Sequence, residues 1–172
     1  MTVLATLLGY IGMTFLVLSF QCKREIVLFW FQMLSGLFFV LHYGLLGDYT
    51  GMAMDGVCFV RAWMMASRKK VFTGLPTLIF LILIILALCI VTWEGVFSIF
   101  PTVALLVSTI FLYSGNGNKI RRAQFFCTSP AWLVYNIHVL SIPGILCELL
   151  DMGSVLLYVV RIWRKNMKSG HN

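Results

Sequence analysis

The stretch FVLHYGLLGDYTGMAMDGVCFVRAW, residues 39–63, decides the fold of this chain, because it holds a short polar turn between two apolar runs. The turn, GDYT, predicts one helix that ends near residue 46 and a second that begins near residue 50. The stretch contains a histidine, two aspartates and an arginine: His42, Asp48, Asp55 and Arg61. Such side chains are costly in apolar surroundings, so each of them needs a partner, water or a function.

The composition predicts that these surroundings are lipid. Of the 172 residues, 60% are apolar and 11% are charged, against about 45–50% and about 25% in a soluble domain. The mean hydropathy is +0.95. We therefore predict a single-domain integral membrane protein. The net charge of +7 comes from short basic clusters between apolar runs, which favours membrane topology over a nucleic-acid partner. The five cysteines have no metal-ligand spacing, so no disulfide framework, metal site or cofactor is expected.

Seven apolar stretches are long enough to cross a bilayer, since a spanning helix needs about 20 such residues. They are residues 3–20, 26–46, 50–66, 75–92, 95–113, 123–141 and 144–163. The connections between them are too short for an extramembrane domain. The expected fold is an all-α integral membrane protein with seven transmembrane helices.

The basic residues predict how these helices are oriented. Lys and Arg cluster in the first, third and fifth connections and in the C-terminal tail, whereas the second, fourth and sixth connections have none. Cytoplasmic loops carry an excess of Lys and Arg. We therefore expect a multi-pass protein with the N-terminus outside and the C-terminus in the cytoplasm.

The chain also contains a weak internal repeat. A shift of 94 residues aligns SGLFFVLH (35–42) with SPAWLVYN (129–136), and a shift of 100 aligns FVRAW (59–63) with VVRIW (159–163). The two matches occur in the same order and at the same places in the predicted topology. They predict a duplication, with a six-residue insertion near the connection between the paired helices.

The repeat implies two three-helix units, spans 1–3 and 5–7, joined by span 4. Repeat one covers about 1–70, the linker helix about 71–94 and repeat two about 95–168. Because each unit has an odd number of spans and one span links them, both have the same orientation in the membrane. This is the parallel-repeat arrangement of some transporters, whose binding site lies near the midplane between the repeats.

With LHYGLLG, FVRAW, LVYNI and VVRIWR in place, the chain resembles the YgjV family of small bacterial inner-membrane proteins. That family is distantly similar to the SWEET and PQ-loop transporters. The resemblance implies a bacterial inner-membrane location and two three-helix bundles joined by an inversion linker helix. The chain has no PQ dipeptide, and Ser129-Pro130 is the nearest equivalent. This departure argues against carrying over sugars as the substrate class.

Polar and aromatic residues at helical spacing are the candidates for a solute site. Ser35, Phe38 and His42 share one helix face, and Ser129, Trp132 and Asn136 share a face by the same spacing. Facing each other, they would line one cavity with aromatic walls and a few hydrogen-bonding groups. The alternative is that the serines and Asn136 only join helices, which membrane interfaces favour.

The acidic residues inside the predicted spans are further candidates. Asp55 and Asp151 lie deep enough to need a proton, water or a partner, and His42 is one such partner for Asp55. Glu148 is expected at the outer interface, and Asp48 is expected to be a turn residue or helix cap.

The two arginines of the aligned motif are expected to act as anchors. From their positions near the cytoplasmic ends of their helices, Arg61 and Arg161 can extend to the membrane interface. Trp63 and Trp163 would lie at the same level, in an aromatic belt.

These features favour a transporter that moves a small polar solute by alternating access through a cavity between the repeats. The alternatives are a non-transporting binding or scaffold protein and a passive channel. No catalytic motif stands out, so an enzyme is not expected. The expected partners are the solute and the lipid bilayer, and assembly into a homo-oligomer is left open.

Overall fold

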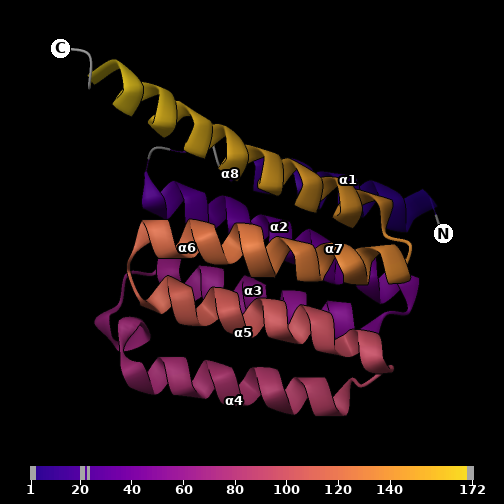
Figure 1. The fold of residues 1–172 in the computed structure, drawn as a ribbon. Helices are drawn as coiled ribbons and strands as arrows, with labels where there is room; N and C mark the ends of the chain where they lie inside the picture. The colour runs from indigo at the N-terminus through magenta and orange to yellow at the C-terminus, as the bar shows by residue number, and fades with distance from the viewer. Residues whose placement is uncertain (1–2, 20–21, 23, 170–172) are drawn as a thin grey trace.

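The computed structural model describes residues 3–19, 22 and 24–169 (Figure 1). Near the C-terminus, side chains are described as far as Leu157 and again at Val160. The side chains of Arg161 and Trp163, expected to anchor the last helix, lie outside the described set.

The described residues form helices and no strands, which confirms the all-α prediction. The α-helices are α1 Val3–Ser19, α2 Glu25–Leu46, α3 Tyr49–Ala66, α4 Leu75–Val91, α5 Ile99–Tyr113, α6 Gly117–Ala123, α7 Ser129–His138 and α8 Ile142–Ser169. Two 3₁₀ turns, η1 Lys70–Thr73 and η2 Val96–Ser98, precede α4 and α5, and a π-helical segment, η3 Gln124–Thr128, joins α6 to α7. Since α6, η3 and α7 follow one another without a break, these elements make seven helical rods, close to the seven predicted stretches.

The rods pack in two layers. Figure 1 shows α4, α5, α7 and α8 side by side in front, with α1, α2 and α3 behind them. Each of α1, α2 and α3 packs against the next along the chain, and α1 and α3 contact α8 and α5 of the front layer. The buried side chains lie between the layers and come from both, as Phe39, Met54, Leu105 and Trp132 illustrate.

The outer surface of this assembly is apolar. Large hydrophobic side chains are exposed along every long helix; on α4 only Leu81 and Ile85 are buried. A soluble protein rarely exposes so large a contiguous apolar surface, whereas a bilayer requires it. By length and composition alone, Glu25–Leu46 and Val96–Tyr113 can each cross a membrane, and Val3–Ser19 and Leu75–Val91 are shorter apolar helices. The third rod, α3, is less apolar because it contains Asp55, Arg61 and two glycines.

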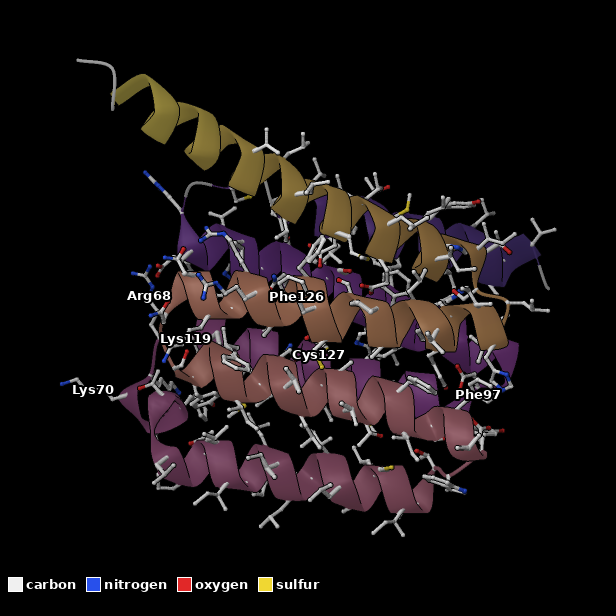
Figure 2. The ribbon with its side chains drawn as sticks, in the orientation of Figure 1. Arg68, Lys70, Phe97, Lys119, Phe126 and Cys127 are labelled. Atoms are coloured by element: carbon white, nitrogen blue, oxygen red, sulfur yellow. The ribbon has the colours of Figure 1, made fainter. Side chains whose placement is uncertain are left out.

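The connections that carry Lys and Arg and those that carry none lie at opposite ends of the rods. Arg68, Lys70 and Lys119 lie together at one end, and Phe97 marks the other end (Figure 2). The other end contains the α2–α3, α4–α5 and α7–α8 connections, which have no Lys or Arg. We refer to these as the basic end and the acidic end, since the acidic end contains Asp48 and Glu94.

Two prolines mark changes of helix type, as expected for residues that cannot donate a backbone hydrogen bond. Pro101 lies just after the change from η2 to α5. Pro130 follows the π segment, in which the Ser129 N–H donates to the carbonyl of Gln124, five residues earlier. The wider turn inserts one extra residue into the rod directly before Pro130.

Candidate functional site

The connection from α2 to α3 is a tight turn held by Asp48. Gly47 has the left-handed conformation, with φ +77°, and the N–H groups of Gly47 and Asp48 donate to the carbonyls of Gly44 and Tyr43. Asp48 then caps α3, because its Oδ1 accepts from the N–H of Gly51 at 3.1 Å. The prediction that Asp48 is a turn residue and cap is confirmed.

The connection from α7 to α8 repeats this geometry. Leu140 is left-handed, with φ +58°, and the N–H groups of Leu140 and Ser141 donate to the carbonyls of Ile137 and Asn136. Ser141 caps α8, since its Oγ accepts from the N–H of Gly144 at 3.2 Å. The two turns therefore match residue by residue, with Asp48 equivalent to Ser141.

Each cap also bonds a side chain from the other half of the chain. The Tyr135 hydroxyl, on α7, donates to Asp48 Oδ1. His42, on α2, places Nε2 at 2.8 Å from Ser141 Oγ. Tyr135 follows His42 by 93 positions, and Ser141 follows Asp48 by the same number. The two bonds are therefore equivalent: one joins a helix of the first half to the cap of the second half, and the other joins a helix of the second half to the cap of the first half. We call them the exchanged bonds.

A third bond lies between the exchanged bonds. The Tyr43 hydroxyl donates to Asn136 Oδ1 at 2.5 Å, and residues 43 and 136 are again 93 apart. The two equivalent residues therefore bond to each other. Tyr43, Trp132 and Tyr135 pack around them with ring centroids 5.9–6.4 Å apart. The side chains of His42 and Asn136 are 0% and 1% exposed, so both point inward, as predicted.

This register corrects the predicted alignment. The sequence matches placed His42 opposite Asn136, at a shift of 94, whereas the turns place Tyr43 there, at a shift of 93. The predicted six-residue insertion near the connection is wrong, because the two turns contain equivalent hydrogen bonds. Arg61 follows its cap by 13 residues and Arg161 by 20, so the two arginines are not equivalent.

The remaining predicted site residues divide into separate groups. Ser129 Oγ donates to Asp151 Oδ2 at 3.0 Å, and Gln124 donates to the same oxygen. Ser35 is buried on α2, and Phe38 stacks on Phe15 of α1, with ring centroids 5.6 Å apart. Phe38 therefore contacts α1, and a solute cavity lined by the predicted residues stays a prediction.

Asp55 and Glu148 occupy equivalent positions, seven residues after their caps. Asp55 is partly buried on α3; it is not paired with His42, whose Nδ1 lies 2.7 Å from the Ala5 carbonyl oxygen and whose Nε2 contacts Ser141. The Glu148 Oε2 atom is buried without a hydrogen-bond partner. The expectation that Glu148 lies at the solvated interface is wrong.

Arg61 also departs from its prediction. Its guanidinium donates to Ser108 Oγ at 2.9 Å and to Thr109 Oγ1 at 2.7 Å, both on α5. The side chain therefore joins α3 to α5 across the two layers. The expected extension to the membrane interface does not describe it.

A cavity of about 290 Å³ opens at the acidic end beside the Asp48 cap. Its lining residues are Leu46, Gly47, Asp48, Glu94, Phe97, Ser98, Tyr135, His138 and Val139. Glu94 is fixed at the rim because its Oε2 accepts from the N–H of Thr50 at 3.1 Å and its own N–H donates to Ser98 Oγ. The three connections of the acidic end therefore meet at this cavity.

Asp48 carries the electrostatics of the cavity. Burial raises the pKa of Asp48 to about 6; the hydrogen bonds from Tyr135 and Gly51 oppose this, and the nearby Glu94 carboxyl adds to it. At neutral pH the carboxyl is therefore mostly ionised. Its Oδ2 atom is buried and has no hydrogen-bond partner.

Comparison with known proteins gives one family. The family Imp-YgjV, described as bacterial inner membrane protein, matches residues 3–166. The chain belongs to this family. No curated protein and no solved structure matches it. The predicted resemblance to the YgjV family is confirmed, and similarity to SWEET and PQ-loop transporters stays a prediction.

Membership in this family places the chain in the bacterial inner membrane. It also agrees with the apolar outer surface of the rods. The family description names no solute, reaction or cofactor, so the function has to be argued from the geometry of the acidic end.

Sequence reasoning missed four residues of this site: Tyr43, Tyr135, Ser141 and Glu94. Tyr43 and Tyr135 adjoin the residues that were chosen, His42 and Asn136. The signal that would have found them is the paired turns, since Gly51 and Gly144 each follow a capping residue, Asp48 or Ser141, by three positions. The predicted alignment, which matched similar residue types at a shift of 94, did not align the two turns.

Proposed function

We propose that this protein transports a small polar solute across the inner membrane by alternating access between two parallel three-helix repeats. The repeats are α1–α3 and α5–α8, with α4 as the linker, and they span the membrane in the same orientation. A passive channel or a non-transporting scaffold is the alternative.

The exchanged bonds are the observation that carries the proposal. They join the turn of each repeat to a helix of the other repeat, so they hold the acidic end closed. Hydrogen bonds of this kind contribute about 1 kcal/mol each. They are weak enough to break and form again as a transporter changes between two conformations. A scaffold needs no such weak, reciprocal closure.

The acidic residues of the interior support transport as well. Asp55, Glu148 and Asp151 lie on the helices that face the other repeat, and the Glu148 Oε2 atom has no hydrogen-bond partner. Ionisable groups inside a membrane are expensive and mark solute or proton pathways by default. The negative charge of carboxylates favours cationic or neutral solutes over anions.

Flux measurements test this function directly. Purified protein in liposomes, given a panel of amines, sugars, amino acids and organic anions, should show saturable uptake of at least one solute. Solute loaded inside should accelerate uptake, because a carrier exchanges. Uptake that does not saturate identifies a channel, and a panel without any flux contradicts transport.

The orientation is a second prediction. The acidic end should face outside, since basic residues are retained in the cytoplasm. In a cysteine-free background, an impermeant thiol reagent added to cells should label Glu94→Cys and should not label Lys69→Cys before lysis. Both positions are exposed. Asp48 and Ser141, in the other two connections of this end, are buried and therefore unsuitable as probes. Labelling of Lys69→Cys on intact cells would contradict the orientation.

A further inference from the structure

An apolar groove lies between α5 and the rod formed by α6, η3 and α7. Its volume is about 340 Å³, and its lining residues are all apolar, with Cys127 counted as a small hydrophobe. Val103 on α5, Phe126 on η3 and Val134 on α7 line the groove and are 39%, 76% and 39% exposed. The groove therefore opens to the surroundings of the helices, which in a bilayer are lipid acyl chains.

Basic side chains lie at one end of the same rod. Lys119 and Arg122 are exposed on α6, and Figure 2 shows Lys119 together with Arg68 at the basic end and Phe126 further along the rod. Arg122 precedes Phe126 by four residues, which puts the two on the same side of the rod. The basic end and the groove are therefore successive parts of one outer face.

The positive charge at this end has little compensation. Among the described side chains, the connections at this end and the helix starts beside them contain one carboxylate, Glu25. The basic side chains there are Arg24, Arg68, Lys69, Lys70, Lys119, Arg121 and Arg122. A guanidinium binds a phosphate through two parallel hydrogen bonds, and basic residues next to a membrane attract anionic lipids. Charge complementarity therefore selects a headgroup that carries a phosphate and a net negative charge.

The length of the groove matches an acyl chain that starts at such a headgroup. At a rise of about 1.5 Å per residue, Phe126 lies about 6 Å and Val134 about 18 Å along the rod from Arg122. The hydrocarbon of one leaflet is about 15 Å deep, half of the bilayer core. A lipid whose phosphate is bound by Arg122 therefore has an acyl chain long enough to follow the groove to the bilayer centre.

A second copy of the chain fits the groove less well. A helix with its side chains is about 10–12 Å wide, so a neighbouring helix would fill only part of the groove with separate side chains. An acyl chain is flexible and has no polar group that needs a partner. Copies in one membrane have the same orientation, so their basic ends would also repel each other.

We propose that the groove between α5 and α7 holds one acyl chain of an anionic phospholipid whose phosphate is bound by Lys119 and Arg122. The occupant is a lipid of the membrane leaflet at the basic end, rather than free phosphate or a second copy. This inference goes beyond the proposed transport function and does not depend on it, because a scaffold or a channel can bind the same lipid.

Native mass spectrometry of the full-length protein, stripped of lipid in detergent, tests the proposal. Palmitoyl-oleoyl phosphatidylglycerol should bind as one saturable lipid, at least about tenfold more tightly than phosphatidylcholine with the same chains, because two basic residues contribute to its headgroup site. Inorganic phosphate at constant ionic strength should not displace it, since phosphate has no chain for the groove. Equal affinity for the two lipids, no binding of either, or displacement by phosphate overturns the proposal.

Arg122→Gln tests the headgroup contact. It should weaken phosphatidylglycerol binding about fivefold, which corresponds to about 1 kcal/mol for one basic residue near the membrane surface. Arg24→Gln makes the same change at an exposed position of the basic end, directly before α2 in the other layer, and should leave the affinity unchanged (Figure 1). Equal weakening by the two variants means a diffuse attraction of anionic lipid to the basic end and overturns the site.

Val103→Phe tests the groove, because the larger side chain occupies space that the acyl chain needs. It should weaken phosphatidylglycerol binding several-fold. Val60→Phe, at a similarly exposed position on α3 outside the groove, is the matched control and should leave binding unchanged. Equal affinity of the two variants overturns the proposal. A dimer in the mass spectrum that dissociates in Val103→Phe, with no lipid bound, also overturns it and assigns the groove to a second copy.

Discussion

Gly144→Ala is expected to destabilise the folded protein by about 1–3 kcal/mol, the usual cost of forcing an extra methyl group into a packed core. A Cβ atom at Gly144 would lie 2.5 Å from Asn136 Cγ. That side chain cannot move away freely, because Asn136 accepts the Tyr43 hydroxyl and is 1% exposed. Thermal unfolding in detergent should show a fall of several degrees in Tm.

Gly153→Ala on the same helix is the matched control. A Cβ atom there would have no neighbour within 4 Å, and alanine favours a helix over glycine by about 1 kcal/mol. This variant should be neutral or slightly stabilised. If both variants unfold at the same temperature, the close packing of α8 on Asn136 is contradicted.

Removing two tyrosine hydroxyls should increase the labelling rate of Cys147 from the outer side by about tenfold or more. Cys147 lies two turns into α8 from the Ser141 cap and is 3% exposed. Tyr43→Phe and Tyr135→Phe remove a bond between the repeats at about 1 kcal/mol each. If these bonds hold the acidic end closed, their loss makes the closed conformation less stable and increases the fraction of molecules in the open conformation.

The measurement uses an impermeant thiol reagent on a background in which the other four cysteines are alanine. Tyr113→Phe is the control, because the Tyr113 hydroxyl donates to the Phe72 carbonyl at the basic end. It removes a similar bond and should leave Cys147 labelling unchanged. Equal labelling rates in the double variant and in Tyr113→Phe would argue for a static scaffold.

The positions of the helices could be predicted from the sequence because lipid imposes a simple rule on length and polarity. The expected break GDYT corresponds to a turn and a cap, and the break near residue 141 does so as well. Long apolar runs form helices wherever they occur. No particular tertiary contact is needed for that prediction.

The equivalence of the repeats was predicted one residue out of register, for a physical reason. Sequence matching pairs similar letters, such as Ser35 with Ser129, whereas the fold pairs residues that occupy the same place relative to a turn. His42 and Tyr135 are different residue types, yet each forms a hydrogen bond with the capping residue of the other half. One residue rotates a helix by about 100°, so the error changed which side chains face the interior.

The contacts of the ionisable residues were the least predictable part. Arg61 is long enough to reach either the interface or a neighbouring helix, and the choice depends on the hydroxyls of Ser108 and Thr109. Glu94 lies in the short connection between α4 and η2, where the sequence has no recognisable motif. Its role depends on Thr50, which lies 44 positions earlier in the chain.

The bond between Tyr43 and Asn136 has a consequence for the history of the proposed duplication. In a symmetric ancestor of two identical halves, a residue on the axis would meet its own copy. If that residue were tyrosine, one hydroxyl could donate a hydrogen bond to the other, but the hydrogen of the second hydroxyl would have no acceptor. Once the halves were fused into one chain, each side could change separately, and a donor now meets an acceptor. A fused chain can therefore have a donor and an acceptor at this pair of positions, whereas a homodimer must have the same residue at both.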